Sequence, residues 1–424
     1  MTEKSAKPQL RFAGFDDTWE QRKLGELSSL ITKGTTPLDK SNMGTVNFVK
    51  IESIDNSSGE ITITQKITSE EHEGYLRRSQ LKENDILFSI AGTLGRVTSV
   101  KSSILPANTN QALAIIRLKS GCLKYVKTYL KGKAVADFIK KNPTIGAQPN
   151  LSLEQVSNLE IALPSDIEQE QIGSFFENLD NLITLHQRKY DKLTNVKKSM
   201  LEKMFPKNGS NVPEIRFKGF SDAWEQRKFD EVFDCTIPNN TLSRAELNYE
   251  SGSVRNIHYG DILIKYGSIV DVQNDEIPFA TGKSSDDFKG ALLQDGDIII
   301  ADTAEDETTG KACEIGNSQG LDVVSGLHTM VCRPRNKMAL GYLGYYLNSD
   351  AYHHQLLPLM QGIKVLSLSR TNVQKTMVCY PKSKAEQQLI ADCFRNLDTL
   401  ITLHQRELEK LKNLKKACLE KMFV

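Results

Sequence analysis

The chain has 424 residues, of which 39% are hydrophobic and 25% are charged, and its formal net charge is +1. That length is enough for two or three domains, each with a core of its own. No apolar run approaches the roughly 20 residues that cross a bilayer, and the start lacks the apolar stretch of a secretory signal, which argues against a membrane or secreted protein.

The seven cysteines are scattered, odd in number and never spaced Cys-x-x-Cys, which argues against a disulfide framework and a zinc site. We therefore expect a cytoplasmic protein without a metal of its own. Charge is spread unevenly: residues 1–165 hold 22 Lys and Arg against 17 Asp and Glu, whereas residues 207–383 hold 18 against 23. If both parts bind a nucleic acid, the second must do so through local basic patches.

The chain carries an internal repeat made of two matched pairs of segments. Residues 8–27 match residues 213–232 at twelve of twenty positions, including the run Glu-Gln-Arg-Lys and the only two tryptophans. Residues 168–206 match residues 386–424 at 24 of 39 positions. The copies therefore share a scaffold.

The segments between the matched pairs differ from each other. Residues 28–150 and 233–365 share only short echoes, such as Asp85-Ile86 and Asp297-Ile298, each at the start of an apolar run. Because the matched segments are repeated while the segments between them vary, we interpret the chain as one scaffold that presents two different surfaces.

The two variable segments alternate β-rich runs, turn signals and helical stretches, which is typical of an α+β domain with a twisted sheet. Strands are predicted at 46–51, 59–65, 85–90, 112–117, 261–265 and 297–301, and helices at 123–140 and 339–356.

The repeated C-terminal segments are predicted to be two long helices with a heptad pattern, the signature of a coiled coil. The positions spaced by seven are Ile172, Leu179, His186, Leu193 and Met200 in the first, and Ile390, Leu397, His404, Leu411 and Cys418 in the second. Thirty-odd helical residues make a rod of roughly 50–55 Å. If the halves are related by a pseudo-twofold, the helices run antiparallel, with one globular domain at each end and the end of the chain close to the N-terminal repeat.

His186 and His404 occupy matching seam positions midway along the two helices. They could form a pH-sensitive or metal-binding pair, but polar residues in a coiled-coil seam more often specify its register. We favour the register role.

The sequence offers no set of residues that indicates catalysis. Thr281-Gly-Lys-Ser-Ser285 and Thr309-Gly-Lys-Ala312 lack the first glycine of a phosphate-binding loop. Asn142-Pro143-Thr144 shares two letters with an amino-methyltransferase motif, but no glycine-rich cofactor fingerprint accompanies it. The acidic run Glu305-Asp306-Glu307 is more often a solvated loop, and the adjacent His353 and His354 of a helix point to different sides.

Taken together, these features resemble the specificity subunit of type I restriction-modification enzymes. The matching pieces are the Trp-Glu-Gln-Arg-Lys openings, the Asp-Ile strand starts, the Glu-Gln helix starts and the Glu-Lys-Met-Phe ends of both helices. The resemblance covers nearly the whole chain. It implies a target recognition domain at 1–165, a spacer helix at 166–206, a second target recognition domain at 207–383 and a second spacer helix at 384–424.

The resemblance also implies a function without catalysis in this chain. Each recognition domain would read one half of a bipartite site in double-stranded DNA, and the helices would set the gap and dock two methyltransferase subunits. Two restriction and translocase subunits would complete the complex. S-adenosylmethionine, ATP and Mg are expected in those partners, and no cofactor is expected in this chain.

Candidate DNA-contacting residues are the Arg, Lys, Asn, Gln and other polar side chains of the variable segments, since such groups reach base edges and phosphates. In the first domain they are Lys33, Thr35, Thr36, Arg77, Arg78, Arg96, Asn108, Asn110 and Gln111. In the second they are His258, Tyr259, Lys265, Tyr266, Lys311, His328, Lys364 and Arg370.

Two other functions stay open at the level of sequence. A coiled-coil scaffold that binds proteins would show weak DNA affinity without a steep dependence on salt. A nuclease or methyltransferase with a degenerate motif would be active as a purified chain.

Overall fold

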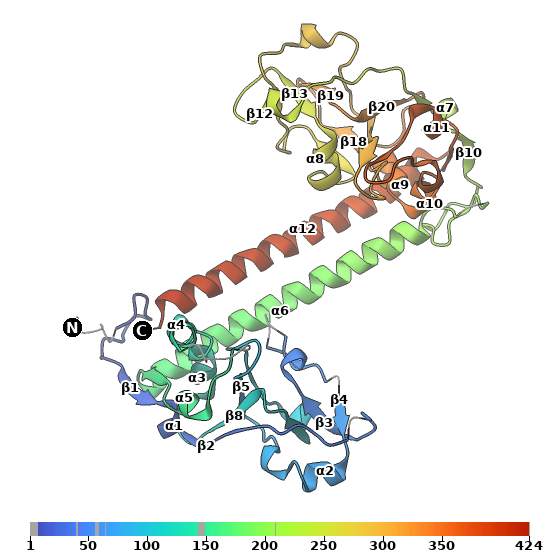
Figure 1. Cartoon of the computed structure of the whole chain (residues 1–424). Helices are drawn as coiled ribbons and strands as arrows, with labels where there is room; N and C mark the ends of the chain where they lie inside the picture. Colours follow the sequence, from blue (N-terminus) through green and yellow to red (C-terminus); the bar gives the residue numbers. More distant parts are fainter. Residues whose placement is uncertain are drawn as a thin grey trace. The chain divides into compact units, whose positions relative to one another are not determined.

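The protein forms two compact units in a computed structural model that describes residues 7–39, 41–55, 59–63, 65–142, 149–207 and 209–423 (Figure 1). The first unit comprises residues 1–189 and 404–424, and the second comprises residues 190–403. Each unit therefore contains one copy of the repeat together with parts of both long helices.

The first unit is built on a four-stranded sheet of order β2-β8-β5-β6, a three-stranded sheet β4-β3-β7 and the pair β1-β9. Its strands are β1 (Glu20–Lys23), β2 (Ser28–Lys33), β3 (Val46–Val49), β4 (Gln65–Ile67), β5 (Ile86–Ser89), β6 (Val97–Ser99), β7 (Ala107–Thr109), β8 (Leu113–Leu118) and β9 (Glu160–Leu163). Its short helices are α1 (Leu24–Leu27), α2 (Ser69–Glu73), α3 (Leu123–Tyr129), α4 (Lys133–Lys141) and α5 (Leu153–Ser157), with 3₁₀ turns η1 (Ile51–Ser53), η2 (Arg77–Ser79) and η3 (Ser102–Ile104).

The second unit holds sheets of order β11-β20-β16-β18-β14 and β12-β15-β13-β19, and the pairs β10-β22 and β17-β21. Its strands are β10 (Glu225–Lys228), β11 (Phe233–Asp234), β12 (Leu247–Asn248), β13 (Val254–Ile257), β14 (Ile269–Asp271), β15 (Phe279–Ala280), β16 (Ile298–Ala301), β17 (Thr303–Ala304), β18 (Ala312–Gly316), β19 (Asp322–Ser325), β20 (Thr329–Pro334), β21 (Leu366–Ser367) and β22 (Met377–Tyr380). Its short helices are α7 (Phe229–Val232), α8 (Tyr259–Ile264), α9 (Tyr342–Leu347), α10 (Asp350–His353) and α11 (Arg370–Val373), with 3₁₀ turns η4 (Arg244–Glu246), η5 (Ser285–Phe288) and η6 (Leu357–Leu359).

The same pairings recur in the two units, which confirms the shared scaffold. The two Glu-Gln-Arg-Lys runs form β1 and β10, and each pairs antiparallel with the last strand of its domain, β9 or β22. In each unit a central hairpin, β5-β6 or β16-β18, lies beside the strand β8 or β20. Each unit also contains a parallel pair, β3-β7 or β13-β19.

Most predicted strands are confirmed, but two of them need correction. Within 59–63 the structure has only an isolated bridge between Ile61 and Ile54, and the strand starts at Gln65. Residues 261–265 lie mainly in α8, not in a strand. The His258 ring caps α8 by accepting from the Gly260 N–H at 3.2 Å, so a sequence that looks like a strand start begins a helix instead.

Both predicted short helices are broken in two. Residues 123–140 form α3 and α4, with Gly132 at the N-cap of the second helix, where glycine is well tolerated. Residues 339–356 form α9 and α10, because the Asn348 side chain donates to the Gly344 carbonyl at 2.7 Å and ends the first helix there.

The long helices α6 (Asp166–Lys203) and α12 (Lys384–Lys421) run antiparallel, as predicted, since the contacts inside each unit run in opposite order along them. In the first unit Phe176 packs against Phe423, with ring centroids 5.6 Å apart, and Asp180 pairs with Lys415. In the second unit Lys197 pairs with Asp398 at 2.5 Å. No helix in the described part of the chain is both long and apolar enough to cross a membrane.

The Met-Phe end of each long helix is buried in a domain core, where the hydrophobic effect fastens helix to domain. Phe423 lies among the rings of Tyr125, Tyr129 and Phe176 in the first unit. The Leu10 N–H donates to the Lys421 carbonyl at 2.9 Å, so the end of α12 lies beside the N-terminal repeat, as predicted. In the second unit Phe205 is enclosed in the same way by Trp224, Tyr342, Tyr346 and Phe394.

Candidate DNA interface

A buried ion pair fixes the central hairpin in each unit. Asp85, which is fully buried at the start of β5, accepts two hydrogen bonds from Arg117 of β8, both at 2.7 Å. Asp297 and Arg333 form the same pair in the second unit, again at 2.7 Å. Each of these charges is paired within the scaffold. The two ion pairs hold the loops beyond the sheet in place.

In the first unit the loop after β2 meets residues from two other segments. The Thr35 N–H donates to the Thr109 carbonyl at 2.9 Å, which lays the loop over the end of β7. Arg78 of η2 donates from Nε to the Thr35 hydroxyl at 3.3 Å, and Thr36 hydrogen-bonds with Gln111. Thus Thr35, Thr36, Arg78 and Gln111, predicted from separate stretches of sequence, form one cluster.

A cavity of about 480 Å³ opens beside this loop. It is lined by Thr36, Pro37, Asn42, Phe48, Lys50, Glu52, Gln65 and Asn110. Most of these side chains carry hydrogen-bond donors or acceptors, which is the chemistry that base edges recognise. We call the exposed or half-buried candidates around the loop the first loop face: Lys33, Thr35, Thr36, Arg77, Arg78, Asn110 and Gln111.

Two candidates of the first domain use their polar groups within the fold, although Arg96 is half-buried. Asn108 is fully buried and hydrogen-bonds with His72 at 2.5 Å, the Leu76 carbonyl at 2.8 Å and Ser79 at 3.1 Å. Arg96 donates from Nη1 to the carbonyls of Ile51 and Ile54, at 3.0 and 3.2 Å. Neither residue belongs to the first loop face.

Lys311 plays the same part in the second unit as Arg96 in the first. Both follow the turn of the central hairpin, and Lys311 donates to the carbonyls of Leu263 and Tyr266, both at 3.0 Å. Burial lowers the pKa of Lys311 below its ordinary value. In both units, therefore, a cation caps the carbonyls at the end of the short helix that follows the parallel strand.

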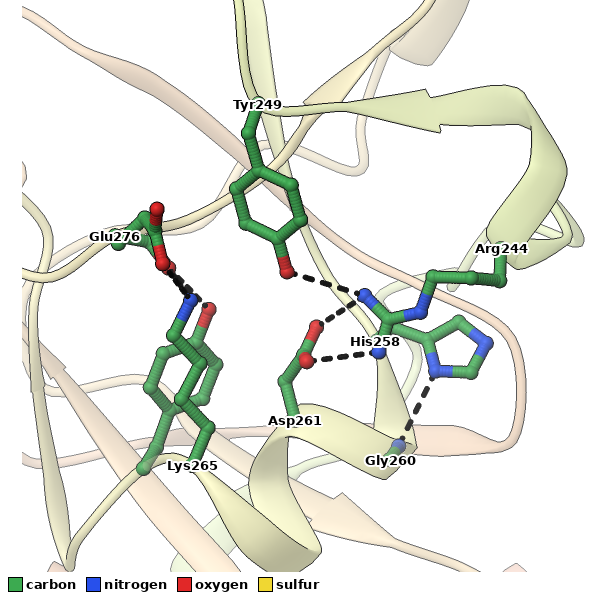
Figure 2. A network of polar contacts seen from close by, with 8 residues as sticks. Arg244, Tyr249, His258, Gly260, Asp261, Lys265 and Glu276 are labelled. Carbon is green, nitrogen blue, oxygen red and sulfur yellow. Dashed lines mark hydrogen bonds and ion pairs between the residues drawn. The ribbon is translucent and has the colours of Figure 1, made fainter. Parts of the chain in front are cut away.

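A second group of candidates, the exposed Lys265 and the buried His258 and Tyr266, belongs to a polar network around α8. Figure 2 shows Arg244 gripping Asp261 with two hydrogen bonds of 2.9 and 2.7 Å, while Lys265 reaches Glu276 at 2.7 Å. The Lys265 ammonium also lies 4.7 Å from the centre of the Tyr249 ring. His258 and Tyr266 are buried at the base of this network, with 7% and 4% of their surfaces exposed.

His258 serves structure there. Burial lowers the pKa of its imidazole, and the positive charge of Arg244 acts in the same direction. A neutral ring suits its role as an acceptor at the start of α8.

The remaining candidates of the second domain surround β17. The Tyr259 and His328 rings meet edge to face at 5.3 Å, and His328 is exposed with a φ of 53°. Residues 364–370 also lie beside β17. The Leu368 N–H donates to the Asp302 carbonyl, and the Asp302 N–H donates to the His328 carbonyl. The second loop face consists of the exposed or half-buried candidates Tyr259, Lys265, His328, Lys364 and Arg370.

The sequence pattern of the type I restriction modification DNA specificity domain matches the chain twice, over residues 16–195 and 221–413. The chain belongs to this family. It is 22% identical over 414 residues to the specificity subunit of the type I restriction enzyme MjaVIII of Methanocaldococcus jannaschii, covering 94% of this chain and 91% of that one. It is 25% identical over 168 residues to the EcoBI specificity subunit of Escherichia coli, covering 38% of this chain and 35% of that one.

The fold of this member of the DNA specificity family also matches a solved structure. The crystal structure of a type I restriction-modification S subunit from M. genitalium superimposes with a TM-score of 0.57 at 15% identity, and 99% of each chain is covered. At that identity the likeness shows the fold alone: two mixed α and β domains and two long helices.

Sequence reasoning missed two residues of the second domain, Thr241 and Lys289, which the scaffold places at positions equivalent to candidates of the first domain. The Asn240 N–H donates to the Ser325 carbonyl at 2.9 Å, as Thr35 does to Thr109, so Thr241 stands where Thr36 stands. Lys289 corresponds to Arg77, since each lies eight residues before the buried aspartate of the hairpin. That spacing was a signal in the sequence, and it could have found Lys289.

The described residues contain no group of three or more His, Cys, Asp or Glu that could hold a metal ion. Of the motif fragments, Pro143 and Thr144 lie outside the described residues. The surfaces that this family member offers for recognition are therefore sets of hydrogen-bonding and cationic side chains on loops.

Proposed function

We propose that the chain reads a bipartite DNA sequence for a type I restriction-modification complex. In this proposal residues 1–165 and 207–383 are target recognition domains that each read one half-site. Residues 166–206 and 384–424 are spacer helices that set the gap between half-sites. The complex acts on DNA and would work in the cytoplasm.

One observation supports this proposal above the others: a single scaffold occurs twice and carries two unlike loop faces. The hairpin ion pairs and the helix-end aromatic clusters match between units. The first loop face, by contrast, holds two Thr, two Arg, one Lys, one Asn and one Gln, and the second holds two Lys, one Arg, one Tyr and one His. Two copies that share a scaffold and carry different loop faces are expected to read two different sequences.

The proposed DNA-contacting residues are the two loop faces, together with Thr241 and Lys289. Arg and Gln side chains such as Arg78 and Gln111 have the geometry to read guanine and adenine edges. Exposed Lys33, Lys364 and Lys289 are proposed to contact phosphates. Asn108, Arg96, Lys311, Tyr266 and His258 are left out, because their polar groups serve the fold.

The partners follow from the same proposal. We propose that the long helices dock two methyltransferase subunits, which supply S-adenosylmethionine chemistry on adenine. Two restriction and translocase subunits would bring ATP and Mg. The comparisons give no support to a coiled-coil scaffold that does not recognise DNA.

The test is a map of adenine methylation in cells that express the whole complex, with the chain intact or with residues 28–150 exchanged for those of another family member. A split motif is expected, and the exchange should change one half of it and keep the other half and the gap. Simultaneous change of both halves would contradict the proposal. Gln111→Ala gives a finer version, since it should relax one position of one half-site only.

A further inference from the structure

A second cavity, of about 510 Å³, lies within the first unit between α4, α6 and the last turns of α12. In Figure 1 α4 lies beside the end of α12. The cavity is lined by Lys131, Gly132, Lys133, Ala136, Asp137, Lys140, Ile183, Lys412, Lys415, Lys416, Leu419 and Glu420. None of these residues belongs to the first loop face.

Positive charge dominates this cavity. Six lysines line it against the carboxylates of Asp137 and Glu420. Asp180 of α6 lies behind two of the lysines, within 3.6 Å of Lys131 and paired with Lys415. One carboxylate thus serves two ammonium groups, and the cavity keeps an excess of cations held close together. Such an arrangement is unfavourable unless an anion joins it.

The helix that borders the cavity adds to this excess. α4 begins after Gly132 without a side-chain cap and has no acidic residue in its first turn. Lysines flank that end instead, although the partial positive charge of a helix N-terminus favours acidic residues.

The other copy of the scaffold shows that the fold does not require Lys131, Lys133 and Lys412, whereas Lys415 and Lys416 recur there as Lys197 and Lys198. Tyr125 and Tyr342 are equivalent, since each hydroxyl hydrogen-bonds to a carbonyl of the last strand, Ala162 or Cys379. Counting onward from them, the run Lys131-Gly132-Lys133 corresponds to Asn348-Ser349-Asp350, and α10 has Asp350 in its first turn. In the helix repeat, Lys412 corresponds to Thr194. The cationic cavity is therefore a property of the first copy.

We propose that this cavity binds a compact anion that carries two or more phosphate groups. Six ammonium groups around one space match a polyphosphate better than a single phosphate. Ala136, Ile183 and Leu419 give the cavity an apolar wall, and its volume is within the roughly 300–1,000 Å³ of small-ligand sites. The phosphates could come from a free nucleotide or from a nucleic-acid backbone, and the chemistry of the site is the same for both.

Proton uptake is expected to accompany binding. The pKa of Lys131 is lowered to about 8, mainly by burial and also by the charges of Lys415 and Lys127, although Asp180 acts in the opposite direction. Lys133, on α4, adds another positive charge at the same cavity. An anion among these groups favours the charged form and raises the pKa, so at about pH 8 formation of the complex takes up a fraction of a proton.

The experiment is calorimetric titration of the full chain with inorganic tripolyphosphate at low ionic strength, in two buffers of different ionisation enthalpy. The test variant, Lys133→Asp/Lys412→Thr, installs the residues of the second copy, so the scaffold tolerates them. Lys198→Thr removes an exposed lysine of α6 at the position that matches Lys416, outside the cavity, and serves as control. Wild type and control should bind one equivalent with buffer-dependent heat, and the test variant should bind at least about tenfold more weakly, since charged hydrogen bonds are lost.

A parallel titration with a DNA duplex that lacks the recognition motif distinguishes the two sources. If the test variant weakens duplex binding and tripolyphosphate competes with the duplex, a DNA backbone supplies the phosphates. If duplex binding is unchanged while tripolyphosphate binding is lost, the ligand is a free polyphosphate. The proposal would be overturned if wild type showed no saturable binding of tripolyphosphate, or if the test variant bound it with equal affinity. Either result would overturn it even if the same lysines proved necessary for binding a protein subunit. Recognition of the bipartite motif would be unaffected by that result.

Discussion

A buried arginine–glutamate pair joins each N-terminal repeat to the start of a long helix. Arg11 donates from Nε and Nη2 to Glu168, at 2.6 and 2.7 Å, and Glu168 is fully buried in the first turn of α6. Arg216 and Glu386 repeat this contact at 2.7 and 2.9 Å. The hydrogen bond to Glu168 raises the pKa of Arg11 above its ordinary value. The pair explains why the repeats at the two ends of each domain occur together.

Removing one partner of this pair should cost more than removing both. Arg11→Met leaves the Glu168 carboxylate buried without its cation, and we expect a loss of about 3–5 kcal/mol in the free energy of unfolding. Arg11→Met/Glu168→Leu should recover most of that loss, because no buried charge remains. Urea denaturation of the full chain measures both. Equal losses in the single and double variants would show that the pair is not the source of the effect.

The two seam histidines lie against each other in the first unit. Their Nδ1 atoms are 3.1 Å apart, and the ring centroids are 5.1 Å apart. One hydrogen bond between these atoms requires that one Nδ1 carries a proton and the other does not. The arrangement fits the role of a polar pair that specifies the register of the seam.

Acidification is expected to weaken this part of the seam. Partial burial lowers the pKa of His404, and the charges of His186 and Lys189 act in the same direction. The folded state therefore binds a proton at His404 less readily than the unfolded state does. The contribution of His404 to stability is present above about pH 6.5 and is lost as the pH falls below that value. Thermal unfolding of wild type and His404→Leu from pH 8 to 5 measures this. The variant should lose less stability on acidification, and parallel curves would contradict the expectation.

At the scale of elements, the start of α6 lies unusually close to α3. A Cβ added at Gly173 would meet Lys124 Cβ at 2.7 Å and Tyr125 N at 2.8 Å. The equivalent position of α12 is Ala391, which is fully buried. In the first unit, the glycine near the start of α6 therefore allows a closer contact between α6 and α3.

Gly173→Ala should destabilise the protein although alanine is the better helix former. The gain in helix propensity is about 1 kcal/mol, whereas overpacking a rigid contact of this kind costs about 1–3 kcal/mol. We expect a net loss of stability by urea denaturation. Ala391→Gly is the matched variant, and it should lose about 1 kcal/mol from helix propensity together with a buried methyl group. A more stable Gly173→Ala protein would mean that α3 can move away.

At the scale of the whole molecule, the proposed gap-setting role of the long helices can be tested by lengthening both of them. Insertions between Lys189 and Tyr190 in α6 and between Leu403 and His404 in α12 fall at the boundary between the two units, so the ion pair of Arg188 with Glu60 in the first unit is kept. Three heptads keep the seam pattern. They add roughly 31 Å at 1.5 Å per residue, which is close to one turn of B-DNA.

With 21 residues inserted in each helix, both halves of the methylated motif should persist and the gap should grow by about nine base pairs, at 3.4 Å per pair. A single heptad in each helix adds about three base pairs, which turns the second half-site about a third of the way around the DNA, so methylation should fall sharply. Methylation maps measure both. An unchanged gap in the long variant would contradict the spacer role.

The sequence by itself determined the features that repeat over short distances. The duplicated frame, the heptad spacing of the long helices and most central strands could be predicted, because residue periodicity depends on neighbours along the chain. The antiparallel course of the helices followed from the order of the repeats. The family resemblance rested on the same local patterns, such as the Glu-Lys-Met-Phe helix ends.

Only the tertiary structure decided which polar side chains face solvent. Arg96 and Lys311 were predicted as DNA contacts, but their polar groups bind distant backbone carbonyls in the fold. Residues 261–265 lie mainly in a helix, which the His258 ring caps and in which Asp261 pairs with Arg244. The lysine cavity joins segments almost 300 positions apart in the chain. The partners of a charge depend on which distant segments meet, and local periodicity carries no record of that.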